Sequence, residues 1–262
     1  MKAKHSISLI GALILLFCTG FALGQEAAKK QLFVIHEDIV KPSKVAQYEK
    51  AAKNLVSKLN EFGISGVNYA AAATNDFHYL YVTPVENMAE LDKNTFAELE
   101  SKVGKEGMKE LWKGFDGCYD VHKNYMITLS HELSYNPENN QMTDEDQPYR
   151  RWQYFHIKPE KEEAAMEIAK KWKALYEKKN IQVGYRVYIG GLGAEMPLLG
   201  TVQWGKDAAD FNAKNAEAIE MLGEEGTQLW EKTLAITRKY ETKEGGMRYD
   251  LAYTPKQPLA EK

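Results

Sequence analysis

The sequence predicts an α+β fold in which one strand–helix–hairpin–helix–strand unit occurs twice. The evidence is that short stretches recur at a shift of 117 or 118 residues: Lys41–Lys44 as Lys158–Lys161, Leu111-Trp112 as Leu229-Trp230, and Glu132–Pro137 as Asp250–Pro255. Apolar residues spaced by three or four also recur behind both lysine-proline junctions, as expected for two amphipathic helices burying the same stripe. A shift held from the first strand to the last indicates a tandem duplication.

The first copy occupies residues 25–137. Residues 31–40 are rich in β-branched side chains and predict a strand, which Pro42 ends because proline disfavours helix in the residue before it. A helix is expected from 44 to 62, followed by a hairpin turning at 74–76. A broken helical stretch from about 88 to 125 and a closing strand at 130–135 complete the copy.

The second copy, residues 148–255, repeats this order. It predicts a strand at 150–157, a helix at 161–179, a hairpin around 190–193, helices over 207–240 and a strand at 247–253. Residues 138–147 are polar, without apolar periodicity, and predict an exposed linker, and residues 256–262 form a C-terminal tail.

This element order is the ferredoxin-like βαββαβ arrangement, with helices on one face of an antiparallel sheet. The other face of the sheet is apolar and has to be buried, and the sheet of the second copy can pack against it. We therefore predict two tandem ferredoxin-like repeats that form a pseudo-dimeric α/β barrel.

The first 24 residues predict export. Lys2 and Lys4 precede an uncharged apolar run, and small residues stand before Gln25, the layout of a secretory signal peptide. A lipid anchor on Cys18 is disfavoured by Phe17, which occupies a place where a small residue is expected. A bacterial periplasmic or secreted protein is the resulting expectation.

Composition excludes several classes of function. The formal net charge of −3 is spread over mixed lysines and acids, which does not predict nucleic-acid binding. No segment of the mature chain is apolar enough to cross a bilayer. Cys118 is the one cysteine after the predicted cleavage site, so an internal disulfide or a cysteine-rich metal site is not expected.

The chain resembles the dimeric α/β-barrel superfamily. Its Lys-Pro-x-Lys junctions are similar to those of the NIPSNAP-like and antibiotic-biosynthesis-monooxygenase-like branches, although Ser43 and Glu160 replace the glycine often found there. The resemblance implies the fold, and activities that include cofactor-free oxygenation, haem degradation and small-ligand binding. The haem-degrading branch uses an Asn, a Trp and a His, types present here as Asn68, Trp112 and His122.

The candidate site is a polar and aromatic cavity between the two sheets. Strand histidines and tyrosines would line it, and the side chains expected to orient a ligand are these: His36, Asn68, Tyr81, Gln153 and Arg186. This choice assumes that these side chains, and not their neighbours along each strand, point into the space between the sheets. With the opposite parity, Ile35, Glu37, Trp152 and Tyr154 point inward instead.

Three functions stay open. An exported protein that binds a small molecule is favoured over an enzyme; a cofactor-free or haem-dependent monooxygenase is the alternative, and a structural or assembly protein is the third. No cofactor is required by the binding hypothesis, whereas haem belongs to the alternative. No metal site is predicted, because His-x-His and His-x-x-x-His pairs do not occur. Homo-oligomerisation is left open.

Overall fold

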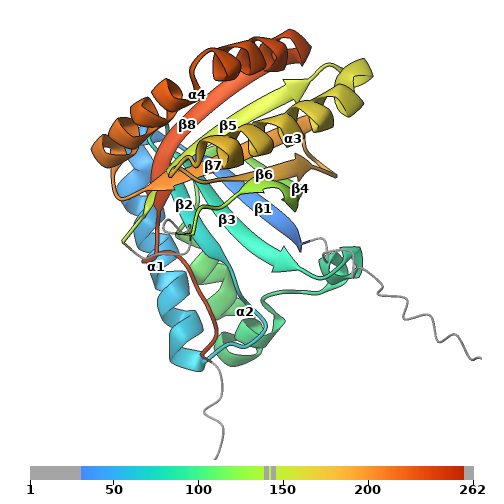
Figure 1. Ribbon diagram of the computed structural model, residues 1–262. Coiled ribbons are helices and arrows are strands. Elements are labelled where there is room, and N and C mark those ends of the chain that lie inside the picture. The colour runs from blue at the N-terminus through green and yellow to red at the C-terminus, as the bar shows by residue number, and fades with distance from the viewer. Residues whose placement is uncertain (1–30, 139–141, 143–145, 257–262) are drawn as a thin grey trace, which may run out of the picture.

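The protein folds as a closed barrel with helices on its outside (Figure 1). The computed structural model describes residues 31–138, 142 and 146–256. The predicted signal peptide, six residues of the predicted linker and residues 257–262 lie outside the described residues. Within the described part, no helix is both long and apolar enough to span a membrane.

The elements occur in the same order in both halves of the chain. The first half contains β1 (Gln31–Val40), η1 (Pro42–Lys44), α1 (Val45–Phe62), β2 (Ala70–Thr74), β3 (His78–Val85), η2 (Met88–Asp92), α2 (Ala97–Lys113) and β4 (Tyr119–Tyr135). The second half contains β5 (Tyr149–Ile157), η3 (Pro159–Lys161), α3 (Glu162–Lys179), β6 (Tyr185–Gly190), β7 (Leu198–Gly205), α4 (Ala208–Ile236) and β8 (Thr237–Met247). The predicted fold of two ferredoxin-like units is confirmed.

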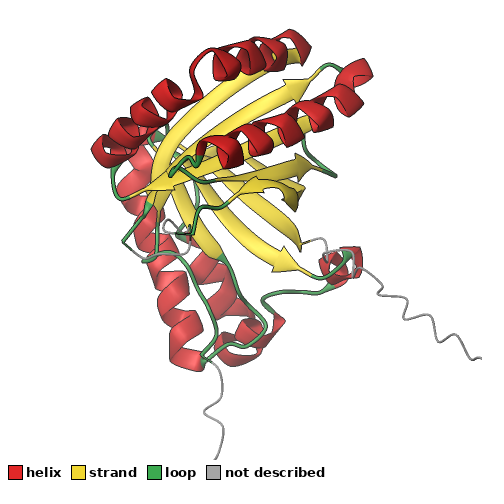
Figure 2. Cartoon of the chain, in the orientation of Figure 1, coloured by secondary structure: helices red, strands yellow, loops and turns green. Residues whose placement is uncertain are grey.

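All eight strands pair antiparallel, in the cyclic order β1-β3-β2-β8-β5-β7-β6-β4. Each half contributes four consecutive strands of this cycle. The halves are joined where β2 meets β8 and where β4 meets β6. Helices α1 and α2 lie over the sheet of the first half, and α3 and α4 lie over the sheet of the second (Figures 1 and 2).

The predicted boundaries of the last strand in each half are wrong. β4 begins at Tyr119, inside the stretch expected to be helical, and β8 runs over 237–247 rather than 247–253. Both segments are rich in polar residues that face outward, so their strand pattern is weak in the sequence. Pairing decides their structure, since β4 pairs with the full length of β1 and β8 with the full length of β5.

Side chains fill the interior of the barrel. Ile35, Leu80, Trp152 and Val202 are all buried there, each less than 10% exposed, and Tyr154 packs against them. Because side chains alternate along a strand, His36 and Gln153 face outward, towards the helices. The expectation of a ligand cavity between the two sheets is therefore wrong.

The end of each half packs into the other half. Leu133 and Tyr135 end β4 but belong to the core beneath α3, where the Tyr135 hydroxyl donates to the carbonyl of Ile181 (2.8 Å). Leu251 and Tyr253 follow β8 but are buried in the cores of the first half. The two halves therefore complete each other's cores.

Candidate functional site

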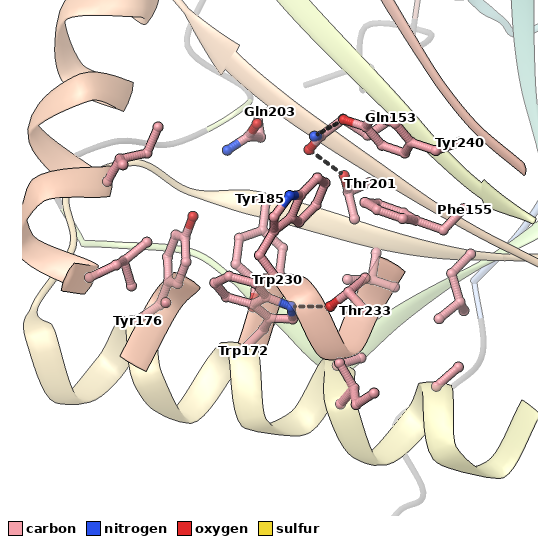
Figure 3. A pocket seen from close by; sticks show the side chains of 18 of the residues that line it. Gln153, Phe155, Trp172, Tyr176, Tyr185, Thr201, Gln203, Trp230, Thr233 and Tyr240 are labelled. Carbon is pink, nitrogen blue, oxygen red and sulfur yellow. Dashed lines mark hydrogen bonds between the residues drawn. The ribbon is translucent and has the colours of Figure 1, made fainter. Parts of the chain in front are cut away.

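A cavity of about 390 Å³ lies outside the barrel, in the second half of the molecule. Its floor is the outer face of the β5–β8 sheet, and its walls are α3 and α4 (Figure 3). Most of its lining is apolar and aromatic, as is usual for a small-molecule site.

The floor changes from apolar to polar along the strands. At one end, Phe155 lies opposite Leu199 and Tyr240 in the strand register. At the other end, the register brings together Tyr185, Gln203 and Arg151.

Gln153 is at the centre of this floor. Its amide nitrogen donates to the hydroxyl of Tyr240 (2.6 Å), and its amide oxygen accepts from Thr201 (3.1 Å). Both ends of the amide are therefore occupied by neighbouring strands (Figure 3). Gln153 therefore links β5 to β7 and β8. The polar side chains that remain to contact a ligand are at the other end of the floor.

Two tryptophans form the walls. The Trp172 indole nitrogen on α3 donates to the hydroxyl of Thr233 on α4 (3.0 Å), which ties the two helices together. Trp230 on α4 meets the rings of Phe155 and Tyr240 edge-on, with ring centroids 6.0 and 5.5 Å apart. These rings give flat apolar surfaces that suit an aromatic ligand.

Two buried donors at the polar end have no hydrogen-bond partner within the described part of the chain. They are the hydroxyl of Tyr185 and the Nε of Arg151. Glu244 lies opposite Arg151 in the strand register. Burial raises the pKa of Tyr185 far above its usual value, so the hydroxyl keeps its proton and acts as a donor. An unsatisfied buried polar group costs about 1–3 kcal/mol, so a ligand oxygen placed here would be stabilised.

The corresponding space in the first half is filled. Tyr48 on α1 takes the place that Ala165 takes on α3, and it is fully buried. Its ring packs against Tyr79, and its hydroxyl reaches Asp38 (2.6 Å) and Tyr81 (3.1 Å). Ala165 lines the cavity, so this large-to-small difference between the halves lies at the site itself.

The structure does not bring the five predicted ligand-binding residues together. Gln153 lines the cavity, while His36 and Tyr81 lie on the outer face of the first half. Asn68 is exposed just before β2, and Arg186 lies opposite Val202, on the interior side of the barrel. The sequence reasoning missed Arg151 and Gln203. The difference between Tyr48 and Ala165, which take corresponding places in the two halves, was the signal that could have located the cavity.

The lining does not fit a haem group. It contains no His, Cys or Met, the usual axial ligands. Tyrosine ligates haem iron in catalase, but the raised pKa of Tyr185 disfavours the phenolate that such a bond needs. We derive no chemistry through haem at this site.

Solved structures share this architecture. An anthrone oxidase-like protein matches with a TM-score of 0.59 and 11% identity, over 85% of this chain and 93% of the other. A protein from Fusobacterium nucleatum described as a candidate monooxygenase matches with a TM-score of 0.53 and 15% identity, over 84% and 93% of the two chains. The chain has the dimeric α/β-barrel fold.

Chlorite dismutase from Candidatus Nitrospira defluvii is more distant, at a TM-score of 0.46 and 10% identity over 84% and 92% of the chains. No family model matches the sequence, and no curated protein matches it. At these identities the likeness establishes the barrel fold alone, and the function has to be argued from the cavity itself.

Proposed function

We propose that the protein binds a small, flat, mostly aromatic molecule that carries an anionic or carbonyl oxygen at one end. The cavity between α3, α4 and the β5–β8 sheet has an apolar end and a polar end, so it distinguishes the two ends of such a ligand. The observation that carries the proposal is the pair of buried, unpartnered donors on Tyr185 and Arg151. A carboxylate or phenolate suits them best, since Arg151 is cationic and its Nε has no hydrogen-bond partner among the described residues.

Binding is favoured over catalysis because the lining offers no group that titrates near neutral pH. No His, Asp, Glu, Lys or Cys is among the residues that line the cavity. General acid–base catalysis works best with a group whose pKa is near the operating pH. Cofactor-free oxygenation of the bound molecule is the second candidate, supported by the names of the two fold neighbours, and a purely structural role is the third.

The test is a titration with two matched probes, 2-naphthoate and naphthalene, followed by quenching of tryptophan fluorescence. We expect saturable quenching by 2-naphthoate, and weaker binding of naphthalene, which lacks the oxygen acceptor. Tyr185→Phe removes one donor and should weaken 2-naphthoate binding by about tenfold, the equivalent of about 1.4 kcal/mol, without changing naphthalene binding.

Tyr249→Phe is the control, because Tyr249 is 52% exposed and does not line the cavity. No quenching by either probe, or equal loss of both probes in Tyr185→Phe, would overturn the proposal. Mass spectrometry of the probe after incubation in air separates the first two candidates: an oxygenated product would identify an enzyme, and unchanged probe supports binding.

We also propose that the protein is exported after cleavage before Gln25, which the pattern of residues 1–24 supports. The intact mass of the protein recovered from cells tests this. Retention of residues 1–24, or a lipid on Cys18, would contradict it. The tandem duplication and the NIPSNAP-like branch are likewise proposals, supported by the recurring Lys-Pro-x-Lys junctions.

A further inference from the structure

Four polar side chains form a compact group on the outer face of the first half, away from the cavity. β1 supplies His36 and Asp38, and β4 supplies His122 and Asn124. The strand register sets Asp38 opposite His122 and His36 opposite Asn124, so all four side chains leave the same face.

Three of these side chains offer metal-ligand atoms at the right spacing. The Nε2 of His36 lies 3.2 Å from the Oδ1 of Asp38, and a ring nitrogen of His122 completes a set in which all atoms lie within 4.8 Å of one another. Zinc bonds to nitrogen and oxygen are about 2.0–2.2 Å long, which places two ligand atoms of a tetrahedral site about 3.3–3.5 Å apart. The His36–Asp38 pair already has this spacing, and the pairs that include His122 would have to close by at most about 1.3 Å around an ion.

The surrounding hydrogen bonds orient the ligand atoms inward. Asn124 Oδ1 lies 2.9 Å from Nδ1 of His36 and accepts a hydrogen bond from its N–H, which leaves the lone pair of the neutral ring on Nε2. Tyr48 donates to Oδ2 of Asp38 (2.6 Å), which leaves Oδ1 as the other ligand atom. Metal-bound histidines and carboxylates characteristically have such outer partners.

Asp38 Oδ1 provides an independent observation. Asp38 is 3% exposed, and Oδ1 has no hydrogen-bond partner in the described residues. His36 Nε2 lies 3.2 Å from this oxygen and forms an ion pair with it when the ring is protonated. When the ring is neutral, the buried carboxylate oxygen faces the lone pair of Nε2, and a metal cation between the two atoms would take the place of the proton.

We propose that His36, Asp38 and His122 bind a divalent transition-metal ion such as Zn²⁺. Two imidazoles and one carboxylate suit such an ion, whereas Ca²⁺ and Mg²⁺ prefer oxygen ligands alone. His122 is exposed and the His36 side chain is 38% exposed, so the ion is reached from solvent and retains an open coordination position. The site is separate from the cavity and does not depend on the proposed function.

Isothermal titration of chelator-treated, untagged protein with Zn²⁺ at pH 7.5 tests the proposal. We expect one ion per chain and a rise in Tm on zinc addition. Substituting Co²⁺ should produce the visible absorption of a low-coordinate cobalt site with mixed nitrogen and oxygen ligands. His122→Gln removes an exposed ligand, so folding should be unaffected while zinc affinity falls at least about 100-fold.

His131→Gln is the matched control, since His131 is also an exposed histidine on β4 but lies outside the group. It should bind zinc as the unaltered chain does. Absence of stoichiometric zinc binding, or equal affinity in His122→Gln and the unaltered chain, would show that His36 and Asp38 form only a protonated ion pair. 2-Naphthoate binding should be the same in His122→Gln and the unaltered chain, so failure of one proposal is distinguishable from failure of the other.

Discussion

The hydroxyl of Tyr253 links the end of the second half to the core of the first, and its removal should destabilise the whole molecule. It lies 2.6 Å from the carbonyl oxygen of Ile64 and 3.2 Å from that of Leu59, and all three residues are buried. Tyr253→Phe keeps the ring but leaves these carbonyl groups without that donor. Leaving a buried polar group unsatisfied costs about 1–3 kcal/mol. In a domain of this size each kcal/mol lowers Tm by about 2–4 °C, so the variant should melt about 2–12 °C lower.

A shorter chain ending at Met247 provides a larger perturbation. It loses the buried side chains of Leu251 and Tyr253, each worth about 1.5–3 kcal/mol. The total is a substantial part of the 5–15 kcal/mol that stabilises a typical protein. The truncated chain should therefore be much less resistant to urea than Tyr253→Phe.

Urea unfolding followed by circular dichroism and by tryptophan fluorescence measures both effects. We expect a single transition, with the two signals coincident in every variant, because each half completes the core of the other. Hydrogen exchange should show reduced protection in α1 of Tyr253→Phe, although the substitution lies in the second half. Two separate transitions, or a loss of protection confined to the second half, would refute the reciprocal packing.

Three further predictions concern single residues. Gly245→Ala should lower the free energy of unfolding by at least about 1–3 kcal/mol, because a Cβ there would lie 2.0 Å from a backbone oxygen of β2. Gly200→Ala is the control and should be tolerated, since the nearest atom to its Cβ would be 3.9 Å away. The urea midpoints of the two variants measure the difference. Arg248 holds the pKa of the Asp250 carboxyl below its usual range, so this pair contributes stability above about pH 4 that is lost as pH falls. Asp250→Asn should therefore cost more stability at pH 7 than at pH 3, and equal losses at both values would contradict the assignment. Cys118 is fully buried, so it should react with a thiol reagent in urea but not in buffer. Rapid labelling of the folded protein would show that the thiol is accessible to solvent, contrary to this prediction.

The architecture was predictable because it depends on patterns that repeat along the chain. The two lysine-proline junctions and the helices behind them lie where the sequence placed them, at η1 with α1 and at η3 with α3. Strand parity was not predictable. A sheet covered on both faces carries apolar side chains on both faces. The sequence therefore could not show whether Ile35 and Trp152, or their neighbours His36 and Gln153, point into the barrel.

The candidate sites depend on contacts between segments that no local pattern reveals. Tyr185, Gln203 and Arg151 become neighbours only through the register of three strands. The histidine group was hidden for a similar reason, since His36 and His122 lie on different strands and His122 was assigned to a helix. A search of the sequence for two metal ligands within one helix or strand cannot find ligands that come from two different strands.

The substitution of Ala165 for Tyr48 has a consequence for symmetry. A barrel assembled from two identical chains must carry two identical spaces under its helices, so any change that opens one also opens the other. Here the halves belong to one chain and differ in sequence, and the tyrosine that packs one side is absent from the other. The molecule can therefore carry the cavity in one half while a packed tyrosine occupies the corresponding place in the other, which two identical subunits related by symmetry could not do.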